Sequence, residues 1–183
     1  MNEVKWTQMV SKRLDERVKD YCIEGKKKLT YANEIIRYGK DEPKYNYMKY
    51  QTDILVYEKG SNENWIPRIV IEGKINSVTT HDAITYSKKA QSHKYVHPYL
   101  RYGILLGNRK HHSLPGSLFR HGSHFDFMLS WKDFIPSSSE LEDLLNIVDK
   151  EIKASKELEE MIFNSRNKNR KKIHSLHKLL IAK

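Results

Sequence analysis

Asp53, Glu72 and Lys74 have the residue types and the spacing that phosphodiester hydrolysis needs. Two carboxylates can hold a divalent cation, and a nearby Lys can position an attacking water molecule. In a β-strand, residues i and i+2 share a face, so Glu72 and Lys74 point together while Gly73 points the other way. Asp53 opens the preceding strand and would reach the same cation across the hairpin. The pattern indicates a metal-dependent hydrolytic site.

The context of the Glu-x-Lys motif selects one copy among several. The motif occurs five times, at 3–5, 24–26, 42–44, 72–74 and 151–153. Three copies lie in helical patterns, where residues i and i+2 point roughly 200° apart. Pro43 interrupts a fourth copy. Only the copy at 72–74 lies in a β-branched run that follows a strand with an Asp, so this copy is the candidate.

The elements that must position these residues follow from hydrophobic periodicity and turn signals. The pattern predicts strands at 47–57 and 66–75, joined by a turn at 60–64, and further strands at 101–106 and 124–131. It predicts helices at 3–28, 31–38, 79–95, 140–162 and 171–181, with loops at 41–46 and 108–123. This order predicts an α/β fold with a small mixed central sheet flanked by helices. We expect one domain over 1–163 and a basic C-terminal helical segment over 164–183.

Charge and composition narrow the class of protein. The 183 residues include 33 Lys or Arg and 23 Asp or Glu, which gives a net charge of +10. Seven of the basic residues and no acid lie between 163 and 183. Such an excess favours a polyanionic partner, with a solvated tail as the alternative. The single Cys excludes a disulfide framework. No apolar run approaches the roughly 20 residues needed to span a bilayer, and the charged N-terminus does not resemble a signal peptide, so we expect a cytoplasmic protein without a membrane partner.

The runs TDILVYE (52–58) and RIVIEGKI (68–75) resemble the PD-(D/E)xK nuclease superfamily, whose fold underlies most type II restriction endonucleases. The resemblance implies a restriction endonuclease-like core. It also implies that Asp53, Glu72 and the carbonyl of Gly73 bind Mg²⁺, while Lys74 positions the nucleophilic water. Thr52 stands where the family pattern has Pro. The order of hairpin, helix and buried strand at 101–106 also matches the family.

Gln91 and an acid of the first helix are further candidates for supporting the metal site. Gln91 and Tyr95 form Gln-x3-Tyr on the predicted helix at 79–95, similar to a motif of the RecB-like branch in which the Gln lies near the active site. The alternative is an exposed helix residue and a Tyr at the core edge. The family also often places an acid on its first helix. Glu24 and Glu34 are candidates, with Glu34 preferred, and a solvated surface Glu is the alternative for each.

Basic and aromatic residues near the candidate site suggest DNA contacts. The Tyr- and Lys-rich segment 43–51 precedes the strand with Asp53, and the loop at 108–123 adds further cations. Such side chains can reach phosphates and pack on sugars, although the tyrosines can equally pack a core. The candidate DNA contacts are Lys44, Tyr47, Lys49, Arg109, Lys110 and Arg120.

The resemblance implies a magnesium-dependent endonuclease that cleaves double-stranded DNA. A chain of this length has little room for a separate target-reading domain. We therefore expect either a homodimer that cuts both strands or a catalytic subunit that cuts one strand beside a larger recognition subunit. One alternative is a RecB-like repair or recombination nuclease. The other is a non-catalytic DNA-binding protein in which Glu72 and Lys74 form a surface ion pair.

Overall fold

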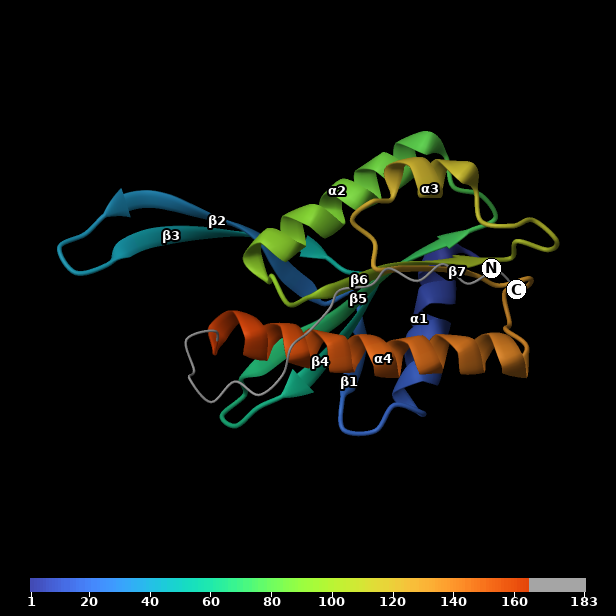
Figure 1. The fold of residues 1–183 in the computed structure, drawn as a ribbon, viewed down its shortest axis with the longest axis horizontal. Coiled ribbons are helices and arrows are strands. Elements are labelled where there is room, and N and C mark those ends of the chain that lie inside the picture. The colour runs from blue at the N-terminus through green and yellow to red at the C-terminus, as the bar shows by residue number, and fades with distance from the viewer. Residues whose placement is uncertain (165–183) are drawn as a thin grey trace.

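A five-stranded mixed sheet forms the centre of the molecule (Figure 1). Its order is β1 (Cys22–Gly25), β4 (Ile54–Lys59), β5 (Trp65–Ile75), β6 (Arg101–Gly107) and β7 (Phe127–Ser130). β1, β4 and β5 pair antiparallel, whereas β5, β6 and β7 run parallel. The computed structural model describes residues 1–164, so the basic helix predicted at 171–181 lies outside the described residues. The architecture confirms the predicted mixed α/β class.

Helices cover both faces of this sheet (Figure 1). α1 (Glu3–Asp15) and α4 (Ser138–Phe163) pack on one face, and α2 (Thr80–Val96) and the short α3 (Gly116–His121) pack on the other. Capping boxes at Thr79 and Ser137 begin the two long helices α2 and α4 by satisfying their first backbone N–H groups. Within residues 1–164, no helix combines the length and the apolar character needed to cross a bilayer.

The alternation of side chains along β5 divides the core into two layers. Ile69 and Ile71 are fully buried in the layer formed with α1 and α4. Val70 is fully buried in the layer formed with α2 and α3. Because successive side chains of a strand point to opposite faces, Glu72 shares the face of Val70 and points toward α2. The core therefore directs the candidate carboxylate away from α1 and α4.

The second sheet is a hairpin that projects from the body of the molecule (Figure 1). It consists of β2 (Lys28–Tyr38) and β3 (Pro43–Gln51), and we call residues 28–51 the arm. The buried Thr52 closes the root of the arm: its N–H and its hydroxyl both donate to the carbonyl of Lys27, at 3.0 and 2.8 Å. The N–H of Lys26 donates to the carbonyl of Thr52 at 3.0 Å. These hydrogen bonds hold the two ends of the arm together where it leaves the body.

Several sequence-based predictions for residues 3–57 are wrong. The helix predicted at 3–28 ends at Asp15, and Asp20 then adopts a positive φ of 68° that redirects the chain into β1. The helix predicted at 31–38 lies in the strand β2, and the loop predicted at 41–46 enters the strand β3 at Pro43, because the two segments pair with each other across the hairpin, as Ile35 does with Tyr45. The strand predicted at 47–57 is two strands that separate at Thr52 and Asp53.

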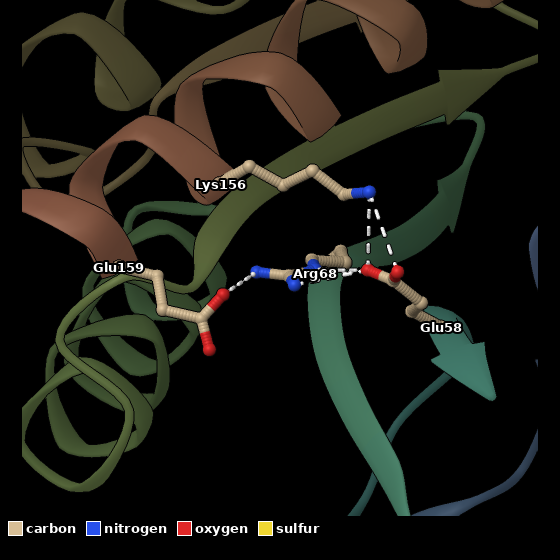
Figure 2. Close-up of polar contacts among 4 residues, drawn as sticks. All are labelled: Glu58, Arg68, Lys156 and Glu159. Carbon is tan, nitrogen blue, oxygen red and sulfur yellow. Dashed lines mark hydrogen bonds and ion pairs between the residues drawn. The ribbon is translucent and has the colours of Figure 1, made fainter. Parts of the chain in front are cut away.

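A buried Arg68 ties the end of α4 to the central sheet (Figure 2). Its guanidinium donates to Glu58 on β4, through Nε at 3.2 Å and Nη2 at 2.9 Å, and to Glu159 on α4 through Nη1 at 2.7 Å. Lys156 adds a contact of 3.3 Å with Glu58. Because a planar guanidinium can satisfy two carboxylates at fixed angles, this network sets the position of α4 across the sheet.

Candidate active site

Glu72 is the centre of the candidate site, and its side chain is only 1% exposed. Lys89 on α2 places its ammonium 2.7 Å from Oε1 of Glu72, and the hydroxyl of Tyr102 on β6 donates to the same oxygen. Oε2 of Glu72 is buried and has no hydrogen-bond partner among the described residues. A buried carboxylate oxygen without a partner is costly, so this atom is available for a ligand.

The electrostatics of Glu72 reflect this burial. Burial, together with the nearby charge of Asp53, raises the pKa of Glu72 to about 7, although Lys89 and the hydrogen bond from Tyr102 oppose this change. Burial, together with the negative charge of Glu72, raises the pKa of Tyr102 well above its ordinary value, so its hydroxyl stays a donor. A carboxylate that titrates near neutral pH and keeps one oxygen free is typical of a functional group rather than of a structural ion pair.

Asp53 lies at the start of β4 and faces the strand that carries Glu72. Its Oδ2 accepts a hydrogen bond from the backbone N–H of Gly73 at 2.9 Å. The carboxylate is close enough to Glu72 to raise the pKa of that residue. The structure therefore brings Asp53 and Glu72 together, in the arrangement that the spacing of the two residues predicts.

Lys74 lies on the same side of β5 and is held by two acids from different helices. Its ammonium is 3.5 Å from Glu3 on α1 and 3.7 Å from Asp82 on α2. Burial disfavours its charge, but a hydrogen bond to Tyr86 and the two acids outweigh burial and raise the pKa of Lys74. Lys74 is therefore a fixed cation, while the cation paired with Glu72 is Lys89.

Gly73 allows α1 to approach β5 between the two charged residues. A Cβ atom at this position would collide with Cγ2 of Thr7 and lie 3.2 Å from Cζ3 of Trp6. Glycine is thus required for close packing of α1 against the strand. Since Glu3 lies on the same helix, this close packing also brings Glu3 to Lys74.

The donor set fits a hard divalent cation such as Mg²⁺. The unpartnered oxygen of Glu72, the carboxylate of Asp53 and the carbonyl of Gly73 are oxygen ligands, which Mg²⁺ prefers, and this ion usually takes only one or two carboxylates. No group of three or more His, Cys, Asp or Glu residues that could hold a metal occurs within residues 1–164. The set therefore suits an ion that keeps several water ligands rather than one enclosed by protein.

The structure does not bring the two predicted supporting residues to this site. Gln91 accepts a hydrogen bond from Lys88 at 2.7 Å on an exposed part of α2, and Tyr95 is 74% exposed. Glu34 lies on the arm, where it accepts a hydrogen bond from Asn46 at 3.1 Å. Neither Glu34 nor Glu24 is on a helix, and α1 instead supplies Glu3.

The predicted DNA contacts fall into two regions. Lys44, Tyr47 and Lys49 are exposed on the arm. In the segment between β6 and β7, the guanidinium of Arg109 donates to the backbone carbonyls of Asn76 and Ser113, so this side chain shapes the loop. The other two cations of that segment are exposed: Lys110 and Arg120.

Sequence reasoning missed five residues that complete the site: Glu3, Asp82, Tyr86, Lys89 and Tyr102. A signal for three of them was present in the sequence. Asp82, Tyr86 and Lys89 are spaced i, i+4 and i+7, so they lie on one face of a helix, and that face points to β5. No local signal pairs Glu3 with Lys74, because only the tertiary fold joins them.

No protein-family model matches the chain, and a search of the curated proteins finds no significant match.

Proposed function

We propose that this protein is a magnesium-dependent DNA endonuclease of the PD-(D/E)xK superfamily that acts on double-stranded DNA. The observation that carries the proposal is the buried Glu72, whose free oxygen lies on the side of β5 that Asp53 and Lys74 also border. Burying a carboxylate costs stability, and one paired oxygen offsets this cost only in part. A buried carboxylate that keeps an unpartnered oxygen therefore favours a role in binding a ligand or in a reaction. The central sheet with helices on both faces is compatible with the restriction endonuclease-like core that the proposal requires.

Asp53, Glu72 and the carbonyl of Gly73 are the residues that would hold Mg²⁺. When bound, the ion supplies a positive charge that stabilises the phosphate and makes water more acidic. Tyr102 and Lys89 bind one oxygen of Glu72, which fixes the rotation of the carboxylate and leaves the other oxygen free. The Lys89 charge also favours the ionised form of Glu72, which is the form that binds a cation.

Lys74 positions the attacking water in this proposal. Glu3 and Asp82 hold its ammonium between two helices, so the side chain has a defined place beside the carboxylates. Because the same acids raise the pKa of Lys74, it stays protonated and donates hydrogen bonds. A fixed donor orients water and phosphate oxygens without reorganising during the reaction.

The pairing of Glu72 gives no support to the non-catalytic alternative, which assumed a surface ion pair between Glu72 and Lys74. Glu72 is buried and pairs with Lys89 instead. Target selection in this proposal comes from a second copy of the chain or from a larger recognition subunit.

The experiment is incubation of plasmid DNA with Mg²⁺ or EDTA, with the protein alone and with candidate partner subunits. Glu72→Gln and Lys74→Ala should each lower the cleavage rate at least a hundredfold, on the order of the loss seen when a metal site is disturbed. Glu142→Gln, at an exposed position on α4, is the control and should leave the rate unchanged. Magnesium titration by calorimetry should show weaker Mg²⁺ binding by Glu72→Gln than by the wild type, whereas Lys74→Ala and Glu142→Gln should bind Mg²⁺ as the wild type does. Absence of Mg²⁺-dependent cutting under every condition overturns the proposal.

A further inference from the structure

The arm extends a two-stranded ribbon into solvent. At about 3.3 Å per residue, the seven residues from Ala32 to Tyr38 span about 23 Å. Large side chains along it are exposed rather than packed: Tyr38, Tyr45 and Tyr47 are 79%, 42% and 57% exposed. Leu29 at the root of the arm is buried in the core, but farther out both faces of the ribbon are in solvent, so the side chains there are available for a partner.

The outer part of the arm carries two cations that face each other. Arg37 on β2 is the cross-strand partner of Lys44 on β3. Like charges directly opposite each other destabilise a strand pair, and neither residue forms an ion pair within residues 1–164. The one acid in the paired strands, Glu34, accepts a hydrogen bond from Asn46 instead. The pair is therefore suited to an anion from outside the chain.

The other face of the ribbon has an aromatic and basic row. Both irregularities of the hairpin insert their extra residue on β2, at Tyr31 and Ile36, so β3 alternates without interruption. Its odd-numbered residues Tyr45, Tyr47 and Lys49 therefore share one face, opposite to that of Lys44. The rings of Tyr45 and Tyr47 lie 6.0 Å apart. The residues paired with this row on β2 are uncharged: Ile35, Asn33 and Thr30. Tyr rings beside Lys, without acids, suit sugars and phosphates.

The root of the arm contacts α2, the helix that carries the Lys89 paired with Glu72. Lys89, which pairs with Glu72, also donates to the carbonyl of Gln51 on β3 at 3.3 Å. On the other strand, Nδ1 of His93 on α2 donates to the carbonyl of Thr30 at 3.1 Å. A polymer bound along the arm would therefore lie beside the candidate active site.

We propose that the arm binds double-stranded nucleic acid as a β-ribbon in the major groove. The inference rests on the proposed function for the choice of a nucleic acid as the partner. A groove about 12 Å wide admits a two-stranded ribbon and has a sugar–phosphate backbone on each side. Inside it, Arg37 and Lys44 meet phosphates from one face, and Tyr45, Tyr47 and Lys49 meet the backbone from the other. Both faces of the ribbon are then used.

The test measures binding of the full chain to a fluorescent duplex by anisotropy, in EDTA and with Glu72→Gln to prevent cutting. Adding Arg37→Gln with Lys44→Gln should weaken binding at least about tenfold and lower the slope of log affinity against log salt by about 1 to 2. Lys150→Gln with Lys153→Gln on α4 removes the same charge from exposed positions and is the control. It should change neither quantity.

A second arm variant separates aromatic from ionic contacts. Tyr45→Ser with Tyr47→Ser should weaken binding severalfold and leave the salt slope unchanged, because no cationic side chain is removed. Thermal unfolding verifies that each variant folds. If a double variant does not fold, Lys44→Gln alone replaces the charge variant and Tyr47→Ser alone replaces the tyrosine variant.

The proposal is overturned if the parent chain does not bind duplex, or if the arm variants bind as tightly as the α4 control. It is also overturned if they change only the oligomeric state, measured by light scattering, since the arm then docks protein. Loss of duplex binding by the arm variants in a protein that never cuts DNA supports the arm proposal and refutes the nuclease. If the wild type cuts DNA and the arm variants bind duplex normally, the nuclease proposal is supported and the arm proposal is refuted.

Discussion

Buried His93 should make the stability of the protein depend on pH between about 4 and 6.5. The imidazole is 0% exposed, and its Nε2 has no partner among the described residues. Burial, together with the charge of Lys89 and the neighbouring His97, lowers the pKa of His93 from 6.5 to about 4, although the hydrogen bond to Thr30 opposes this change. The native protein therefore holds His93 neutral where the unfolded chain protonates it.

The sign and size of the effect follow from proton linkage. Between pH 4 and 6.5 the unfolded state binds more protons than the native state, so the free energy of unfolding falls as the pH falls. Above pH 6.5 both states are neutral at this position and His93 adds no pH dependence. The two pKa values give a loss of about 2 kcal/mol at pH 5 and about 3 kcal/mol at pH 4, relative to pH 8.

The assay is urea unfolding of the wild type and of His93→Phe at pH 8, 7, 6 and 5, followed by circular dichroism. Phe retains a ring beside Tyr31, Tyr50 and Tyr102 but loses the hydrogen bond to Thr30, which costs about 1 to 2 kcal/mol at every pH. The unfolding free energy of the wild type minus that of His93→Phe should then fall by about 2 kcal/mol from pH 8 to pH 5. The other titratable groups are the same in the two proteins, so their contributions to the pH dependence cancel in this difference.

A matched control replaces a histidine that the fold leaves in solvent. His111→Gln, at an exposed turn, should give a difference from the wild type that stays constant over the same range of pH. A constant difference for His93→Phe as well would refute the reasoning, since it would mean that His93 takes up a proton equally in the native and unfolded states.

The remaining predictions concern packing and the buried ion network. Gly73→Ala should lower the free energy of unfolding by about 1 to 3 kcal/mol, because the added methyl collides with α1, whereas Gly60→Ala adds a Cβ at an ordinary 3.5 Å from its nearest neighbour and should change it little. Urea unfolding at pH 7 measures both. Arg68→Met should cost about 2 to 4 kcal/mol by removing the link between β4 and α4, and Lys153→Ala, in an exposed pair, less than about 0.5 kcal/mol. Equal effects of the two substitutions in calorimetry would contradict the assigned role of Arg68.

The elements around the candidate site were predictable because each has a strong local signal. The run at 66–75 alternates apolar residues with Glu72 and Lys74, and burial of its isoleucines fixes the register of β5. Thr79 and Asp82 form the capping box that begins α2. These signals act within a few residues, so they place Glu72 and Lys74 on the correct face without tertiary information.

The arm and the cation paired with Glu72 were not predictable for a common reason: both depend on residues distant in sequence. A strand with two solvated faces has no apolar alternation, so Tyr31, Ile35 and Tyr38 fit a helical period as well as a strand. The pairing of Lys89 with Glu72 requires α2 to pack across β5, which no segment specifies alone. Glu3 reaches Lys74 only because Gly73 lets α1 approach.

The hydrogen bonds at the root of the arm make the outer hairpin independent of the rest of the fold. The chain leaves the body after Lys27 and returns at Thr52, and these two residues are hydrogen bonded to each other. Beyond the contacts that Leu29, Thr30 and Gln51 make with the body, the hairpin can change in length or sequence while Asp53 keeps its place on β4. Replacing the outer hairpin of this chain would therefore change what the arm contacts and leave the candidate site in place.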